Sequence, residues 1–148
     1  MEVFLCFSPT DPLALVEMTM QAWEPIQWAE PFNVVQVPVH DFEIRRRVIA
    51  DRMAKEDHYI LVDLGCVPEN ERAIPQIEKL WSSKDGLMGL DDATIPTPHG
   101  IRVVRKGMIN KWPTAVTTSY DEDHAIAVEQ AGFNVSTCPI TFKRIQDC

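Results

Sequence analysis

A carboxylate stands at the end of an apolar strand in the segment HYILVDLGCVPEN, residues 58–70. The run Ile60, Leu61 and Val62 is typical of a buried strand, and Asp63 follows it directly. In open α/β sheets, ligands bind in the crevice outside the carboxyl ends of the strands, so a carboxylate here suits hydrogen bonding to a ligand. The structural alternative, which is the commoner case, is an aspartate that ends a strand and caps the next turn.

Four ionisable residues follow Tyr120 at the predicted start of a helix: Asp121, Glu122, Asp123 and His124. Carboxylates are stabilised at a helix N-terminus by its free N–H groups and its dipole, so capping alone would explain them. Neighbouring carboxylates also raise one another's proton affinity, which suits one of them to act as a general base. The segment therefore predicts either a capped helix or a proton acceptor.

Three consecutive arginines, Arg45, Arg46 and Arg47, spread over most of a predicted helical turn. A solvated helix face explains at least two of them. A third could point into a crevice, where the planar guanidinium donates two parallel hydrogen bonds to a diphosphate. The chain contains neither a G-x-G-x-x-G fingerprint nor a G-x-x-x-x-G-K-[ST] loop, which excludes those two modes of NAD and ATP binding.

The cysteines are widely spaced along the chain, and no close pair of the kind that holds zinc is present. They are Cys6, Cys66, Cys138 and Cys148, and the pattern predicts free thiols. Cys66 lies near the predicted strand end, where a nucleophile is conceivable, but a small half-buried hydrophobic residue is the more common role.

Composition favours one soluble domain over residues 1–148, because 45% hydrophobic residues in 148 suffice for one core. The 14 basic and 22 acidic residues give a net charge of −8, which repels phosphate backbones and disfavours nucleic acid as a partner. No apolar run approaches the roughly 20 residues that span a bilayer. We therefore expect no membrane span and a cytoplasmic location.

Predicted strands and helices alternate, which is typical of an α/β domain with a mostly parallel sheet flanked by helices. Asp11 is predicted to cap the first helix, whose buried face carries Leu13, Val16 and Met20. The predicted strands span 3–7, 33–39, 59–62, 86–90, 101–104 and 134–142, and the predicted helices span 12–23, 69–81 and 121–131, with another beginning at 41.

The order of these pieces resembles a family 2 glycosyltransferase with the Rossmann-like GT-A fold. The likeness rests on a first strand leading to Pro9 and Thr10, then IRRRVIADRMAKEDHYILVD, GLMGL, IRVVRKGM and SYDEDHAIAVEQAGFNV. These segments cover most of the chain and follow one another as they do in that family. The resemblance therefore implies a single GT-A-like domain.

The same resemblance implies transfer of a sugar from a nucleoside-diphosphate sugar to an unidentified acceptor hydroxyl, usually with inversion. Counting back from Gly132 places Asp121 at the position of the family's catalytic base. The positions implied to border the nucleoside, the ribose, the donor sugar or the diphosphate are Pro9, Thr10, Arg47, Asp63 and Asp123.

The chain departs from the family at the Asp-X-Asp motif, where it has Asp-Leu-Gly at 63–65. Neither Gly65 nor a neutral Cys66 thiol replaces the second carboxylate, which the family uses to hold a divalent cation. Lys143 and Arg144 end the last predicted strand, where they could neutralise a departing diphosphate or simply solubilise an edge strand. The interpretation is a transferase that needs metal weakly or not at all.

Two other hypotheses remain open at this stage. A GT-A-like domain that has lost catalysis could keep a nucleotide-sugar pocket or serve as a protein-interaction module, and the altered 63–65 motif favours this reading. A different nucleotide-dependent enzyme, such as a nucleotidyltransferase, is the third, because fold alone does not fix the reaction.

Overall fold

The computed structural model describes residues 2–7, 9–26, 33–38, 49, 57–91, 98–108 and 120–145, with the backbone alone for 2, 33–38, 120 and 121. Its elements are β1 (Glu2–Phe7), α1 (Leu13–Trp23), β2 (Asn33–Pro38), β3 (His58–Asp63), β4 (Cys66–Pro68), α3 (Ala73–Leu80), β5 (Asp85–Asp91), β6 (Ile101–Arg105), α4 (Tyr120–Gln130) and β7 (Asn134–Arg144). Apart from β4, each corresponds to a predicted strand or helix. The helix predicted to begin at 41 lies outside the described residues except for Ile49, which is helical and buried.

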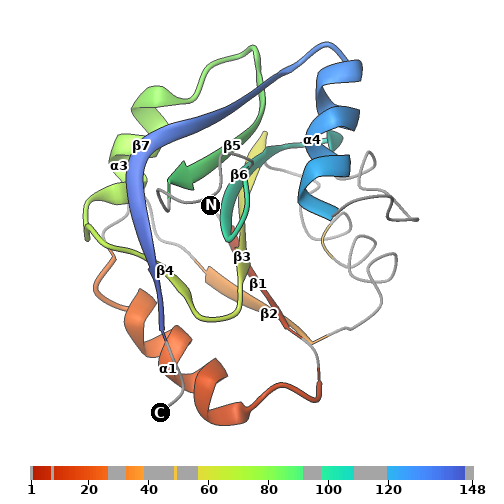
Figure 1. The fold of residues 1–148 in the computed structure, drawn as a ribbon. Helices are drawn as coiled ribbons and strands as arrows, with labels where there is room; N and C mark the ends of the chain where they lie inside the picture. The colour runs from red at the N-terminus through yellow and green to blue at the C-terminus, as the bar shows by residue number, and fades with distance from the viewer. Residues whose placement is uncertain are drawn as a thin grey trace.

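The strands form one sheet in the order β2-β1-β3-β6-β5-β7-β4 (Figure 1). The expected α/β class is confirmed, but the sheet is mixed instead of mostly parallel, because β6 runs antiparallel to both β3 and β5, and β4 antiparallel to β7. Residues 92–100, which join β5 to β6, are too few for the dozen or so that a parallel crossover needs. Strands β1, β3, β5 and β7 all end at one edge of the sheet, which we call the carboxyl edge.

Each face of the sheet has its own hydrophobic core. Along β3, Ile60 and Val62 contribute to the core beneath α1 and α3, whereas Tyr59 and Leu61 contribute to the core beneath α4, which also contains Ile49. This division follows from the alternation of side chains along a strand. Figure 1 shows the same layering, with α1 and α3 to the left of the central strands and α4 to the right.

Helix α1 differs from the prediction at its start. Pro12, and not Asp11, occupies the N-cap position, and no side-chain hydrogen bond caps the helix. Leu13 is 70% exposed, so its predicted place on the buried face is wrong. Thr19 and Trp23 are buried instead, together with Val16 as predicted, and these positions recur at the three- and four-residue spacing of one helix face.

The segment after the β3–β4 turn was expected to enter a helix near Glu69 and instead forms β4 first. Cys66–Pro68 pairs antiparallel with Phe142–Arg144 of β7, and the amide of Glu69 donates to the carbonyl of Thr141 at 3.1 Å. Helix α3 starts only at Ala73, after Asn70 has turned the chain. A pairing partner more than 70 residues away thus overrides the local preference for a helix start.

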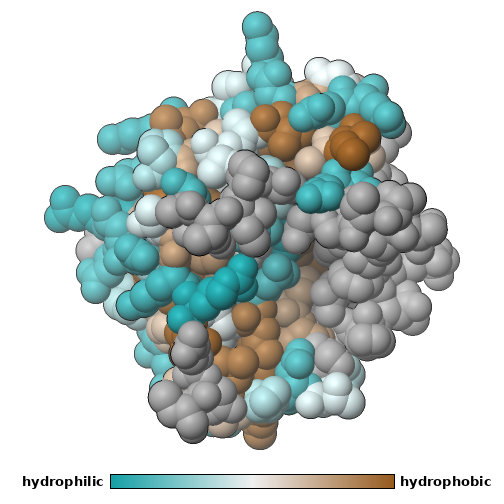
Figure 2. Space-filling view, viewed as in Figure 1, coloured by the Kyte–Doolittle hydropathy of each residue, from teal (hydrophilic) through white to brown (hydrophobic). Residues whose placement is uncertain are grey.

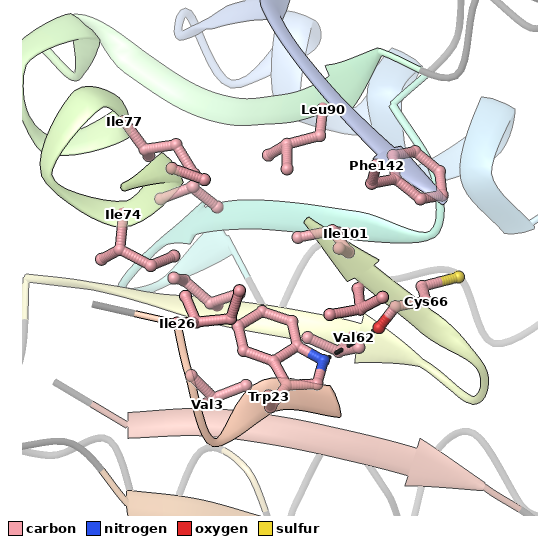
Figure 3. Close-up of a cluster of buried hydrophobic side chains, with 14 of the residues drawn as sticks. Val3, Trp23, Ile26, Val62, Cys66, Ile74, Ile77, Leu90, Ile101 and Phe142 are labelled. Atoms are coloured by element: carbon pink, nitrogen blue, oxygen red, sulfur yellow. Dashed lines mark hydrogen bonds between the residues drawn. The ribbon is translucent and has the colours of Figure 1, made fainter. Parts of the chain in front are cut away.

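Trp23 connects α1 to β4 inside the first core. Its indole is 2% exposed, and Nε1 donates a hydrogen bond to the carbonyl oxygen of Cys66 at 2.9 Å. Figure 3 shows this bond beneath a layer of aliphatic side chains that includes Ile74 and Ile77 from α3. The bond orients the short β4 strand, because a buried carbonyl needs a donor.

We predict that Trp23→Phe lowers the free energy of unfolding by about 2 kcal/mol, because it removes the donor to Cys66 and leaves a small cavity. Urea denaturation followed by circular dichroism would measure this loss. Leu13→Ala in the same helix, at an exposed position, should change stability by less than about 0.5 kcal/mol. Equal losses in the two variants would contradict the structural role of the indole.

Candidate functional site

Asp63 ends β3 at the carboxyl edge and forms an ion pair with Arg102 of β6. The guanidinium Nη2 lies 2.7 Å from the carboxylate Oδ1, and the two side chains are 4% and 41% exposed, respectively. Burying the guanidinium costs desolvation energy, which the charge of the partner carboxylate offsets. The charge-assisted hydrogen bond between them also fixes the orientation of the carboxylate. Arg102 therefore orients the Asp63 carboxylate, which remains partly open to solvent at the strand end.

The turn after Asp63 is held in place at Gly65. Its φ of +85° lies in the left-handed region, where a side chain is strained. The amide of Gly65 donates to Oγ1 of Thr19 in α1 at 3.1 Å, and its carbonyl accepts from the amide of Ile145 at 2.6 Å. A Cβ at this position would lie 3.2 Å from the carbonyl oxygen of Ile145. Gly65 therefore forms a tight turn that favours glycine.

A cation lies beside this turn at the end of β7. Arg144 pairs in register with Cys66; its Nη1 lies 3.3 Å from the Cys66 sulfur, and its guanidinium sits 5.6 Å from the centre of the Phe142 ring. The same ring packs against Gly100, whose carbonyl accepts a hydrogen bond from the Asp63 amide at 2.7 Å. Arg144 is exposed at the end of β7.

The first turn of α4 lies on the same face of the sheet as Asp63 and Arg102. His124, at the start of the second turn, is 1% exposed, and its Nε2 lies 3.1 Å from the carbonyl oxygen of Met108. Burial lowers the pKa of His124 to about 4, the hydrogen bond to Met108 works in the opposite direction, and the charge of Arg102 lowers it further. The imidazole is therefore neutral at pH 7 and donates from Nε2.

The fold brings most of the predicted site residues toward one edge of the sheet. Pro9 and Thr10 follow the end of β1 and are exposed, and Asp63 ends the adjacent strand β3. Helix α4 precedes β7 and leads to its start at the opposite edge, so the helix begins on the side of the carboxyl edge, with Asp121 and Asp123 in its first turn. The helix expected at Asp121–Ala131 is confirmed, and Gly132 closes it at a φ of +92°. Arg47 lies outside the described residues.

Arg102 was not recognised from the sequence as a site residue. It interrupts the apolar run Ile101, Val103 and Val104, and a charge inside a central strand is the signal that could have marked it. Its partner Asp63 is 39 positions away, however, so only the antiparallel pairing of β3 with β6 shows that they meet.

The side chains around the turn and at the end of β7 include the Asp63 carboxylate, the Cys66 thiol and the Arg144 guanidinium. Asp63 Oδ1 already faces a guanidinium, Gly65 offers no side chain, and the Cys66 sulfur is a soft donor beside Arg144. Magnesium and manganese take several oxygen ligands, and the turn itself contributes one carboxylate side chain, that of Asp63. In the part of the chain that the structure describes, no three His, Cys, Asp or Glu side chains come together as a potential metal site.

This face of the molecule combines polar and apolar surface. Figure 2 shows hydrophilic residues over the side formed by α3 and β7, and an apolar area at the lower centre, where Figure 1 draws β1 and β2. Among the described helices, none is long and apolar enough to cross a membrane.

No protein family and no curated protein matches the sequence, whereas solved structures do match the fold. A197 from STIV superposes with a TM-score of 0.60 at 9% identity, over 99% of this chain and 85% of that one. A mutant of Drosophila β-1,4-galactosyltransferase 7, solved with manganese, UDP-Gal and xylobiose, gives 0.60 at 16% identity, over 99% and 71%. A glycosyltransferase involved in glycosylation of the major capsid of PBCV-1 gives 0.50 at 14% identity, over 74% and 61%.

Two of these structures are glycosyltransferases with a GT-A-like fold. The chain therefore has a GT-A-like α/β fold, as the resemblance implied, with a mixed sheet flanked by helices. Identities of this size establish the fold and leave the reaction to be argued from the site.

We predict that Gly65→Ala lowers the free energy of unfolding by about 2 kcal/mol or more, because strain at positive φ adds to the close contact with the Ile145 carbonyl. Gly107 is a matched control, since its φ is +90° and a Cβ there would meet nothing within 4 Å. Gly107→Ala should cost only about 1 kcal/mol. Equal costs, measured by urea denaturation, would show that the contact at Gly65 contributes nothing.

We also predict that stability depends on pH through His124. Since the folded pKa is lowered to about 4, the unfolded chain binds more protons below pH 6.5 or so, and stability falls as the pH drops through this window. Between pH 7.5 and 4 the loss assigned to His124 is about 3 kcal/mol. His124→Gln keeps a donor for Met108 but cannot titrate, so its urea denaturation should lack this part of the pH dependence; parallel profiles would remove the assignment.

Proposed function

We propose that this protein transfers a sugar from a nucleoside-diphosphate sugar to an acceptor hydroxyl. The observation that carries the proposal is the half-exposed Asp63 carboxylate, fixed by buried Arg102 at the carboxyl edge of a GT-A-like sheet. In open α/β sheets this edge is where nucleotides bind. The resemblance of the ordered sequence segments to family 2 glycosyltransferases supports the same reading.

The proposed reaction is an in-line displacement with inversion. The acceptor oxygen attacks the anomeric carbon of the donor sugar and forms the new glycosidic bond, while the bond from that carbon to the diphosphate oxygen breaks. Asp121, in the first turn of α4, takes the proton of the acceptor hydroxyl. The nucleoside diphosphate leaves with the bonding electron pair.

Donor binding is proposed for residues that the sequence resemblance implies. Pro9 and Thr10 would border the nucleoside, and Asp63 would approach the ribose. Asp123, in α4, would also contribute to donor binding. Arg47 is retained as a donor-binding residue on the strength of the sequence resemblance alone.

Lys143 and Arg144 are proposed to neutralise the leaving diphosphate. Both are exposed at the end of β7, and Arg144 is oriented by the Phe142 ring and the Cys66 sulfur. Preorganised cations aimed at a developing charge lower the barrier of a group transfer. The galactosyltransferase described above was solved with manganese, whereas the turn of this chain suits cationic side chains better.

The alternative is a module that binds a nucleotide sugar without turning it over. The single carboxylate at 63–65 favours it, because the family normally places two acids there. The two functions differ in one measurable respect, which is whether nucleoside diphosphate is released from a bound donor.

Binding can be screened by thermal shift with uridine, guanosine, cytidine and adenosine diphosphates and their sugars, each with manganese and with a chelator. A ligand at 100 times its Kd adds about 2.7 kcal/mol, which raises the Tm by several degrees in a chain of this size. No shift with any of them would reject donor binding. A shift that needs manganese would reject the role given to Lys143 and Arg144.

We predict that Asp121→Asn lowers turnover at least about 100-fold, because it removes the base while leaving donor binding intact. Turnover is measured as release of nucleoside diphosphate from the preferred donor with a panel of small sugar acceptors. Glu122→Gln, an exposed acid in the same turn, is the control and should leave turnover unchanged. Unaltered release by Asp121→Asn would remove it as the base, and binding without release by the parent protein would favour the inactive module.

A further inference from the structure

Arg102 is a charged residue built into the middle of the sheet. It lies on β6 directly opposite Leu61 of β3, so its side chain shares a sheet face with Leu61 and, diagonally, with Asp63. The residue is 3% exposed and is flanked by apolar neighbours on its own strand. Burying a guanidinium is costly unless a charged partner compensates it, so this position calls for a specific reason.

The geometry of the pair suggests that reason. One guanidinium nitrogen engages one carboxylate oxygen at 2.7 Å, and Asp63 keeps 41% of its side chain exposed whereas Arg102 keeps 4%. A carboxylate has about four acceptor positions, so a single bond from Arg102 leaves capacity for further donors. The exposed part of Asp63 lies at the carboxyl edge, where the ligand is proposed to bind.

We propose that Arg102 is a positioning residue that aims the Asp63 carboxylate at the ribose hydroxyls of a nucleoside diphosphate. This inference rests on the proposed function. A vicinal diol offers two O–H donors on one side of a ring, which suits a carboxylate whose orientation is already fixed. Preorganisation lowers the cost of ordering the side chain on binding.

The test compares each nucleoside diphosphate of the panel with its 2′,3′-dideoxy analogue by isothermal titration calorimetry. In the parent protein the preferred ribonucleotide should bind about tenfold or more tightly than its dideoxy form, the size expected for hydrogen bonds to a charged acceptor. Arg102→Met should reduce this ratio to between one and about three, and Arg102→Lys should recover part of it. Asp63→Asn should also reduce it, and Arg102→Met combined with Asp63→Asn should reduce it no further.

Arg105 provides the matched control. It is the other arginine of β6, lies opposite His58 at the far edge of the sheet, and donates to the carbonyls of Asp85 and Ser82 at 2.6 and 2.9 Å. Arg105→Met makes the same substitution on the same strand and removes two hydrogen bonds. It should leave the ratio of ribonucleotide to dideoxynucleotide affinity at its parent value. Circular dichroism melts establish that each variant is folded, and if Arg102→Met does not fold, Arg102→Lys and Asp63→Asn decide.

The outcomes separate this inference from the proposed function. If the parent discriminates and Asp63→Asn does not, while Arg102→Met and Arg102→Lys both discriminate fully, Asp63 contacts the ribose but Arg102 does not position it. If all variants discriminate as the parent does, both residues are excluded from ribose recognition while nucleotide binding stands. If the parent binds no nucleoside diphosphate, the proposed function and this inference are rejected together.

Discussion

The left-handed turn at Gly65 is the constraint on which the rest of the candidate site depends. Its amide is held by the Thr19 hydroxyl of α1, and its carbonyl is held by the Ile145 amide just beyond β7. Segments near the beginning and the end of the sequence therefore both hydrogen-bond to Gly65. After this turn the chain enters β4, which pairs with the end of β7 and brings Arg144 beside Cys66.

Strand β7 gives the sheet its second essential property, which is curvature. Residues 134–141 of this strand run parallel to β5, with register shifts, and residues 142–144 pair with β4 instead. In Figure 1 the strand crosses from the side of α4 to the side of α1 as it does so. One strand thus links the two cores and delivers basic residues to the edge where Asp63 lies, so that charge placement at the site follows from the twist of the sheet.

The sequence predicted the features that depend on local pattern. Apolar runs marked the main strands, and the left-handed closure of α4 at Gly132 followed from a glycine after a helical pattern. Features set by distant pairing were missed: β4 exists because β7 is its partner, and Arg102 meets Asp63 because β6 returns alongside β3. Gly65 was interpreted as a lost acid, whereas the structure gives it a positive reason to be glycine, namely a turn that a side chain would strain.

Among the described residues, Tyr59 and His124 both interact with the charge of Arg102. Burial raises the pKa of Tyr59 well above its usual value, and burial lowers that of His124 to about 4, so both are neutral at pH 7 although both feel the guanidinium. The positive charge is then balanced by Asp63, which reaches solvent at the carboxyl edge. Because the guanidinium is buried, water screens its interaction with Asp63 less than it would screen the interaction of an exposed cation. The fold has therefore placed a permanent cation behind the Asp63 carboxylate, and the other side of that carboxylate is open to solvent.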